Sequence, residues 1–411
     1  MPDASPARRS TRQPVHTVYG GAHLFTPETT AKLGAIALKT LREYAPDAAT
    51  LATALAMDAS LAERIYPRVV AKLEREPVED YRIDFEDGFG SRPDAEEDTV
   101  ARTAALNVAA GMKAGTLPPG IGIRIKNLGD ETQHRALRTL GLFVSAMVDG
   151  AGGTLPPDFI VTLPKITAPD QVSMLVSACG ALEKSHKLPA GSLKFEVMIE
   201  TAESIFSRDG RVALPEFIAR GQGRVTAAHF GTYDYTASMG ITAAHQHMLH
   251  PACDFAKHVM QVALSGTDVW MSDGATTILP TGKDRSVIHA AWKLHADQVR
   301  HSLIGGFYQG WDLHPAQLVT RYAAVYAFFL EGLDAASERL QNFVQKAAQA
   351  TSVGGVFDDA ATGQGLLNYF LRAMNCGAIT EQEAVKMSGL TVTELKSKSF
   401  GKIAAGRRQQ A

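Results

Sequence analysis

Short apolar runs that each end in polar residues recur along most of this chain, and this recurrence constrains the fold more than any other sequence feature. Eight runs are candidate strands, at 16–25, 80–88, 120–127, 158–166, 194–200, 224–235, 267–274 and 307–315. From the second run to the eighth, residues near the run ends are spaced 34 to 40 positions apart. A strand with its crossover helix takes about 30 residues or more, so each interval holds one βα unit. The pattern predicts eight parallel strands alternating with helices.

Eight units of this size favour an α/β fold of the closed (β/α)8 type, a TIM barrel, over a doubly wound open sheet. We expect the barrel to span residues 16–325, with a helical, Ala/Leu-rich insertion at 30–79. Residues 1–15, rich in Pro, Ser and Arg, are predicted to be a disordered tail. Residues 326–411 are predicted to form a helical C-terminal extension, frayed from residue 402 onward. The extension would cap the barrel or contact another subunit of a homo-oligomer.

Composition argues against several classes of protein. A net charge of -2 over 411 residues, with no basic stripe, gives no field for holding nucleic acid. Cys179, Cys253 and Cys376 are odd in number and far apart, which argues against a disulfide framework and favours a reducing compartment. No signal-like segment and no apolar run of about 20 residues occurs, so we expect a cytoplasmic protein with no membrane partner.

Polar residues gather at the predicted strand ends, which in a parallel barrel open onto the face where active sites lie. They are Asp84, Glu86, Asp87, Arg124, Lys126, Asn127, Lys165, Glu200, Asp234, Asp273, Asp312 and His314. Glu200 and Asp234 come from neighbouring strands, so their carboxylates can converge on one point. Hard oxygen ligands suit Mg²⁺ or Mn²⁺, and Mg²⁺ takes one or two carboxylates plus water and substrate. We predict a Mg²⁺ site here, although either acid alone could be a helix cap or an ion-pair partner.

Two cations in these strand ends allow two interpretations each. Arg124 lies in an apolar strand, and a buried Arg needs a partner. It could form a structural salt bridge to strand 2 acids, stabilise an oxyanion at the barrel mouth, or do both. Lys165 could be a Schiff-base lysine, but a charge partner for Glu86 or Asp87 is the simpler interpretation.

A histidine cluster, His245-x-His247-x-x-His250, suggests zinc at first sight. Its spacing matches no established ligand pattern. We therefore interpret these histidines as surface or local packing residues.

Seven short motifs in family order resemble the citrate lyase β-subunit family, which is grouped with the HpcH/HpaI aldolases and malate synthases. They are Asp-x-Glu-Asp at 84–87, Arg-Ile-x-Asn at 124–127, Leu-Pro-Lys-Ile at 163–166, Ile-Glu-Thr-Ala at 199–202, Gly-x-x-Asp at 231–234, Asp-Gly at 273–274 and His-Pro-Ala-Gln at 314–317. The resemblance implies a barrel, Mg²⁺ on Glu200 and Asp234, and substrate contact by Arg124. It also implies a role for Glu86 and Asp87 at the water shell of the metal.

The first strand, Val-Tyr-Gly-Gly-Ala-His-Leu-Phe, departs from the family pattern, which leaves open whether CoA is used. We expect a Mg²⁺-dependent carbon–carbon lyase or aldolase acting on a small 2-oxo or hydroxy acid, in which Arg124, Glu86 and Asp87 are catalytic and Lys165 binds the carboxylate. One alternative is a malate-synthase-like condensing enzyme. Another is a phosphoenolpyruvate-type phosphotransferase, although no Gly-x-x-x-x-Gly-Lys-Ser/Thr loop occurs.

The last candidates lie in a Gly-rich turn between two helical stretches of the C-terminal extension. Asp358 or Asp359 could reach a barrel mouth as a general acid or base. The alternative is a solvated turn whose acids cap the next helix.

Overall fold

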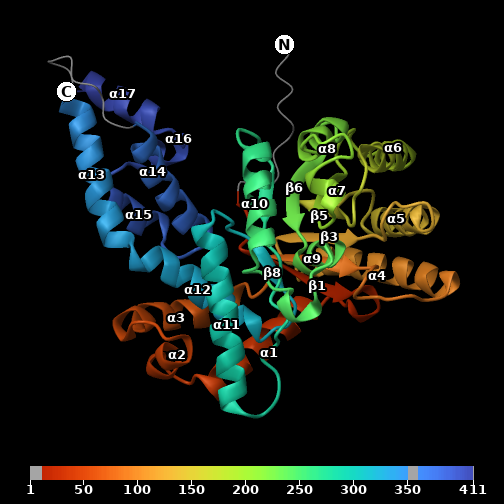
Figure 1. Ribbon diagram of the computed structural model, residues 1–411, viewed down its shortest axis with the longest axis horizontal. Helices are drawn as coiled ribbons and strands as arrows, with labels where there is room; N and C mark the ends of the chain where they lie inside the picture. The colour runs from red at the N-terminus through yellow and green to blue at the C-terminus, as the bar shows by residue number, and fades with distance from the viewer. Residues whose placement is uncertain (1–11, 350–359, 411) are drawn as a thin grey trace.

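All eight predicted strands are present and run parallel in one sheet. The structure, a computed structural model, describes residues 12–349 and 360–410 (Figure 1). The strands are β1 (His16–Gly21), β2 (Asp80–Asp84), β3 (Gly120–Arg124), β4 (Phe159–Leu163), β5 (Lys194–Ile199), β6 (Val225–Phe230), β7 (Trp270–Ser272) and β8 (Gly310–Asp312). They pair in the order β7-β6-β5-β4-β3-β2-β1-β8. Each strand is shorter than the apolar run that predicted it, because the polar run ends turn into loops.

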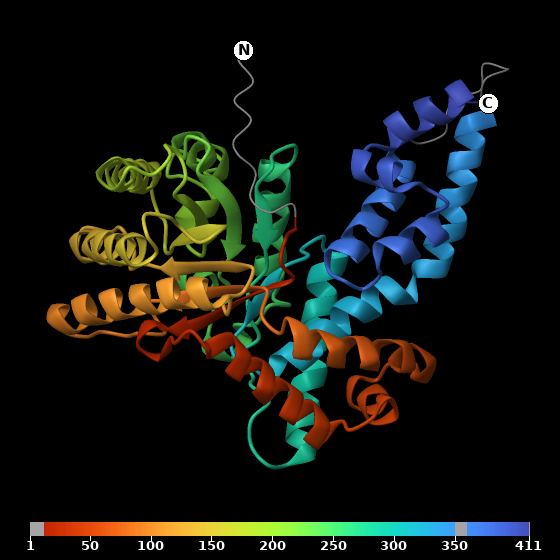
Figure 2. The same cartoon turned by 180° about the vertical axis from the view of Figure 1, so that it is seen from behind.

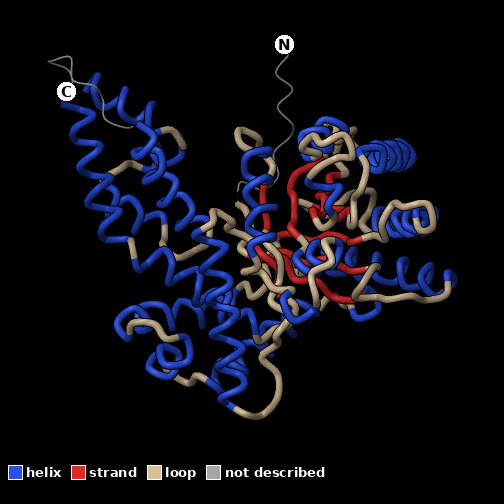
Figure 3. Tube along the Cα trace, viewed as in Figure 1, coloured by secondary structure: helices blue, strands red, loops and turns tan. Residues whose placement is uncertain are grey.

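The sheet nearly closes on itself between β7 and β8. The backbone N–H of Asp273 donates to the carbonyl of Gln309 at 2.8 Å, and that of Trp311 donates to Gly274 at 3.1 Å. Figure 3 shows the strands gathered in one part of the molecule, surrounded by helices. The fold is therefore the predicted TIM-barrel-like α/β fold, and the open-sheet alternative is wrong.

Helices follow the strands around the outside of the barrel. The longer ones are α4 (Asp94–Ala114), α5 (Gln133–Gly150), α6 (Pro169–His186), α8 (Leu214–Arg220), α10 (Pro251–Leu264), α11 (Arg285–Ile304) and α12 (Gln317–Glu331). Short turns α7 (Ala202–Ile205) and α9 (Thr232–Ser238) begin directly at the ends of β5 and β6. These two turns carry the residues that follow Glu200 and Gly231 across the mouth of the barrel.

Three helices lie between β1 and β2: α1 (Thr29–Tyr44), α2 (Ala48–Leu55) and α3 (Ala59–Arg75). Asp47 and Asp58 begin α2 and α3 by accepting backbone N–H groups, as N-cap residues do. The apolar face of α3, which includes the buried Ile65 and Val69, packs toward α12. This group of helices therefore lies beside β8 and its helix rather than over the polar strand ends.

Five further helices form a separate group after α12 (Figure 2). They are α13 (Leu333–Gln349), α14 (Ala360–Asn375), α15 (Glu381–Ser388), α16 (Val392–Ser397) and α17 (Phe400–Gln410). The prediction of a frayed end from residue 402 is wrong, because α17 is a helix that buries Phe400, Ile403 and Ala404 against α13 and α14. No helix among the described residues is both long enough and apolar enough to cross a bilayer.

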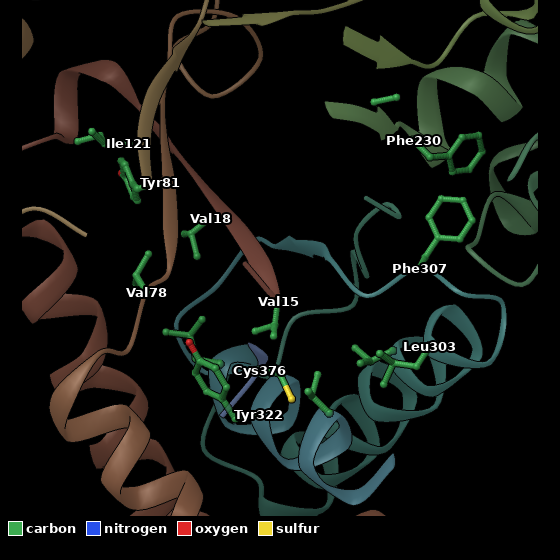
Figure 4. Close-up of a cluster of buried hydrophobic side chains, with 14 of the residues drawn as sticks. Val15, Val18, Val78, Tyr81, Ile121, Phe230, Leu303, Phe307, Tyr322 and Cys376 are labelled. Carbon is green, nitrogen blue, oxygen red and sulfur yellow. The ribbon is translucent and has the colours of Figure 1, made fainter. Parts of the chain in front are cut away.

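Apolar contacts join the C-terminal helices to the barrel. Figure 4 labels Val15, Tyr322 and Cys376, which belong to one continuous buried cluster drawn from the start of β1, from α12 and from the end of α14. Gln13 strengthens this junction, because its backbone N–H and carbonyl both bond the side chain of Asn375. Residues 1–11 of the expected tail lie outside the described residues, whereas Gln13 and Val15 are buried.

Candidate active site

A cavity of about 360 Å³ opens at the carboxyl ends of the strands. Its walls come from the ends of β1, β2, β3, β5, β6, β7 and β8. Four of the predicted site residues line it: Asp87, Arg124, Glu200 and Asp234. This is the face on which barrel enzymes carry their active sites.

Arg124 is clamped at the edge of this cavity by an acid from the neighbouring strand. Its Nε and Nη2 donate to the two carboxylate oxygens of Asp84 at 2.7 and 2.5 Å. The third nitrogen, Nη1, lies 3.3 Å from Glu86 and 3.5 Å from Asp87, and donates to Met198 Sδ at 4.0 Å. Burial alone would raise the pKa of Asp84, but the Arg124 guanidinium holds that pKa below its usual value. The structural salt bridge therefore exists, and it leaves Nη1 available on the cavity side.

Two aromatic rings support the guanidinium of Arg124. Its central carbon lies 5.0 Å from the ring centroid of Tyr19 and 5.8 Å from that of Trp311. The two rings stack on each other at 4.3 Å. Cation–π contacts of this kind favour a charged arginine in a desolvated place. The planar fork of Arg124 is thus fixed by the bidentate Asp84 contact and by this aromatic pair.

Lys165 contacts acids from two other strand ends, those of β2 and β6. Its Nζ lies 3.0 Å from Glu86, 3.2 Å from Asp87 and 3.8 Å from Asp234. Burial would lower the pKa of Lys165, but these carboxylates raise it above its ordinary value. This direction of the pKa and the three carboxylates around Nζ favour the charge-partner interpretation over a Schiff-base lysine.

The backbone of Lys165 also takes part in the site. Its φ of 49° is in the left-handed region, which is uncommon for a residue with a side chain. In this conformation its N–H donates to Glu200 Oε1 at 2.7 Å. Strained backbone of this kind clusters at functional sites.

Glu200 is almost completely buried, with 1% exposure, and it lies against a glycine. A Cβ on Gly231 would be 2.3 Å from Glu200 Oε2, so only glycine leaves room for this carboxylate. Burial and the nearby Asp234 and Glu86 raise the pKa of Glu200 to about 8. The acid is thus held where its negative charge is poorly compensated.

Two neighbouring acids, Glu86 and Asp234, share this condition. Burial raises the pKa of Glu86 to about 7, and Arg124 offsets only part of that effect. The Oε2 atom of Glu86 is buried and makes no hydrogen bond among the described residues, and its ion-pair partner is Arg124 Nη1 at 3.3 Å. Burial also raises the pKa of Asp234, although its side chain is 44% exposed. Several carboxylates with raised pKa values in one cavity are typical of a functional site.

Two predicted strand-end acids point away from the cavity, contrary to the expectation that all of them face it. Asp273 bonds Lys257 at 3.0 Å and Ser302 at 2.6 Å, both on the surrounding helices. Asp312 bonds Arg321, His16 and His295 and is completely buried. Side chains alternate along a strand, so the cavity receives their neighbours Gly274, Trp311 and Leu313 instead.

The residues present fit a divalent cation by donor type. Glu200 and Asp234 are oxygen donors from adjacent strands, and the raised pKa of Glu200 indicates unmet demand for positive charge. Among residues 12–349 and 360–410, no three His, Cys, Asp or Glu side chains are grouped to hold a metal ion. A two-carboxylate set completed by water and substrate is what Mg²⁺ commonly uses, and Lys165 lies beside it.

The histidine cluster has a local structural role instead. His250 begins α10, because its Nδ1 accepts the backbone N–H of Ala252 at 3.1 Å. His245 lies in a single 3-10 turn before that helix. Asp358 and Asp359, proposed from the sequence as proton-transfer residues, lie outside the described residues.

Comparison with known families identifies the chain. The family model for a domain of unknown function, DUF6986, matches residues 2–403. The chain belongs to the DUF6986 family. A search of curated protein sequences gave no match to this DUF6986 protein.

Solved structures resemble the DUF6986 protein in fold. A citrate lyase from Burkholderia xenovorans LB400 is 19% identical, covers 78% of this chain and 91% of its own, and has a TM-score of 0.55. A malate synthase from Haloferax volcanii, in complex with magnesium and glyoxylate, is 15% identical with a TM-score of 0.47 and covers 96% and 97%. The first likeness agrees with the barrel, whereas the second is too weak to support any inference about the site.

Three features of the DUF6986 site were missed in the sequence. Tyr19 and Trp311 were assigned to apolar strands, although their position near the strand ends was a usable signal. The third feature is a charged pair inside the barrel, where Arg82 bonds Glu196 at 2.8 and 2.9 Å. Its signals were Arg82 between Tyr81 and Ile83 in β2, and Glu196 between Phe195 and Val197 in β5.

Proposed function

We propose that this protein is a Mg²⁺-dependent carbon–carbon lyase of the aldolase type that acts on a small 2-oxo or hydroxy acid. The observation that carries the proposal is the group of four carboxylates, from Glu86, Asp87, Glu200 and Asp234, around Lys165 and beside Arg124 Nη1. Such a site combines negative charge for a cation with fixed positive charge for an anionic substrate. Cleavage next to a carbonyl needs both, because an enolate forms at neutral pH.

Glu200 and Asp234 would hold the metal. Mg²⁺ bound there would supply Lewis acidity to a carbonyl oxygen of the substrate. Glu200 is fixed for this task by the backbone N–H of Lys165 and by the space that Gly231 leaves. Asp234 is half exposed, so it can bind a cation that arrives from solvent.

Arg124 would stabilise the negative oxygen that develops during cleavage. Asp84 holds its Nε and Nη2, so only Nη1 is directed to the substrate region. Its orientation is set before the reaction, so little reorganisation is needed in the transition state. Lys165, as an ammonium ion on the same side, would bind the substrate carboxylate.

Glu86 would move the proton, with Asp87 as the second candidate. Glu86 lies between Arg124 and Lys165, and its Oε2 makes no hydrogen bond among the described residues although it pairs with Arg124 Nη1. A carboxyl group with a pKa of about 7 can release and regain a proton near neutral pH. Asp87 is 58% exposed and would act through a bound water.

Calorimetry with Mg²⁺ tests the metal site directly. Glu200→Gln and Asp234→Asn should each abolish Mg²⁺ binding, while circular dichroism shows an unchanged fold. Glu216→Gln, an exposed acid on α8, is the matched control and should bind Mg²⁺ normally. Unchanged affinity in both site variants would contradict the metal assignment.

A substrate screen tests the reaction. We expect one or more 2-oxo or hydroxy acids, with or without CoA, to be cleaved only when Mg²⁺ is present. Net synthesis from glyoxylate and an acyl thioester, without cleavage of any hydroxy acid, would favour a condensing enzyme instead.

A further inference from the structure

A second and larger cavity, of about 970 Å³, lies at the opposite end of the barrel from the carboxylate site. Four parts of the chain line it. They are helix α3, the segments at the starts of β1, β7 and β8, Tyr326 of α12, and the C-terminal helices α14 to α16 with the loops between them. In Figure 2 these C-terminal helices stand beside α12 and α3. A ligand bound here would touch both the barrel and the C-terminal helices.

Positive side chains dominate the walls of this cavity. Seven line it, and the described residues contribute only one acid, Glu381, which pairs with Lys396 at 3.4 Å. Four of the seven are balanced by acids. Lys396 is one, Arg68 pairs with Glu383 at 2.6 Å, and Lys72 and Arg12 share Glu76 and Glu79.

The other three cations are Arg75, Arg372 and Lys398. Within the described part of the chain, the side chains of Arg75 and Lys398 make no ion pair or hydrogen bond, and Arg372 has no carboxylate partner. The cavity therefore holds an excess of positive charge that the described residues do not neutralise.

Arg372 is the most informative of the three. Its guanidinium lies 4.5 Å from the ring centroid of Tyr308, and its Nη1 donates to Gln13 at 2.6 Å. Gln13 is itself fixed by Gln309 and by the carbonyl of Met271. Burial lowers the pKa of the Arg372 guanidinium from its usual value. A partly buried arginine whose neighbours are all neutral destabilises the folded protein unless an anion lies beside it.

We propose that this cavity binds a phosphorylated organic molecule of nucleotide size, with its phosphate groups on Arg75, Arg372 and Lys398. A phosphate carries about two negative charges at neutral pH, and the arginine fork matches its oxygens. The cavity is near the upper end of the range for small-molecule sites, about 300 to 1,000 Å³, so it has room for more than a phosphate. Trp270 and Tyr308, which are partly exposed, offer aromatic surface for a planar group.

This ligand would be separate from the proposed substrate. The basic cavity lies at the amino-terminal ends of the strands, whereas Glu200 and Arg124 lie at their carboxyl-terminal ends. A ligand there cannot touch the reacting atoms. Its effect would be to fasten α14 and α16 to the barrel, which stabilises the folded protein by mass action.

Calorimetry and thermal unfolding of the full-length protein with ADP test the proposal. ADP should bind the wild type and raise its melting temperature. Arg372→Gln should weaken ADP binding at least about tenfold, which is the loss expected for charged hydrogen bonds. The double variant Arg75→Gln/Lys398→Gln changes only exposed side chains, so it should fold normally and show a similar loss.

Two controls locate and define the site. Arg220→Gln removes one exposed charge on α8, and Asp234→Asn changes the other cavity, so both should bind ADP as the wild type does. Pyrophosphate should compete with ADP, and adenosine should not. No binding of ADP up to millimolar concentration, or equal binding by all variants, would overturn the site. Competition by adenosine as strong as that by pyrophosphate would overturn the phosphate assignment.

Discussion

Acids at the strand ends fall into two groups that differ in what surrounds them. On β5 and β6, Glu200 and Asp234 face the cavity, and burial raises the pKa values of both. On β8, Asp312 faces away from the cavity, where Arg321 of α12 and His16 of β1 hold its pKa well below the usual value although burial opposes this. Asp273 on the β7 side is likewise enclosed by Lys257 and Ser302.

The role of a strand-end acid therefore depends on whether the fold gives it a permanent, positively charged partner. Arg321 is supplied by α12 and Lys257 by α10, and both pack directly behind their strands. A fully paired acid stabilises the fold and has no charge left for a ligand. An acid that lacks this pairing destabilises the fold slightly and attracts a cation, which is the condition for binding or catalysis.

Removing a paired acid should have the largest effect on stability. Asp312→Asn leaves Arg321 buried without its carboxylate, so we expect a loss of about 3–5 kcal/mol in the free energy of unfolding. Denaturant titration measures this change. Asp234→Asn, on the half-exposed side chain, should cost less than about 1 kcal/mol. Equal losses in the two variants would remove the distinction between the two groups.

Replacing Arg124 at the edge of the cavity should decrease turnover more than it decreases the stability of the fold. Arg124→Lys should lower kcat at least about 10²-fold on the substrate that the screen identifies, equal to about 2.7 kcal/mol. Lysine keeps the charge but loses the planar fork that Asp84 and Tyr19 position. Steady-state kinetics of the folded variant provide the measurement. Near-normal turnover would reduce Arg124 to a structural ion pair.

Filling the space beside Glu200 should show whether Mg²⁺ binding depends on the position of this carboxylate. Gly231→Ala keeps every ligand, but its methyl group would meet Glu200 Oε2 and displace it. We expect Mg²⁺ affinity to fall about tenfold, or about 1.4 kcal/mol, by calorimetry. Gly141→Ala is the matched control, since a methyl group there meets nothing within 4 Å. Normal Mg²⁺ affinity in Gly231→Ala would show that Glu200 does not need its present position.

Lowering the pH should gradually decrease the free energy of unfolding, through the buried group formed by Asp312 and His295. Burial lowers the pKa of His295 below 6.5, so the unfolded chain gains a proton there before the folded protein does. The pKa of Asp312 is also lowered, so below pH 3.8 the unfolded chain again takes up a proton first. Protonation of Asp312 in the folded protein then removes its stabilising charge. Stability should therefore fall by up to about 1.4 kcal/mol per pH unit for each proton taken up. Denaturant titrations from pH 7 to pH 3 on the wild type and His295→Gln check this, and identical slopes would contradict it.

Much of the fold could be predicted from the sequence. Each of the eight apolar runs contains a strand. Eight βα units with this regular spacing can form few other arrangements. Helices were also expected at 30–79, which is rich in Ala and Leu, and in the C-terminal extension at 326–411. The end of the chain was misjudged, because Phe400, Ile403 and Ala404 gain a helical partner only when α13 and α14 are packed beside them.

By itself, the sequence determined which polar residues end the strands, and therefore that Arg124, Lys165, Glu200 and Asp234 meet at one end of a barrel. Tertiary structure alone decided which acids face the cavity. Alternation along β8 directs Trp311 inward and Asp312 outward, and the helices behind then supply Arg321 and His295. The physical reason is that the ionisation of a side chain depends on its burial and on partners far away in the sequence. The local pattern of residues encodes neither.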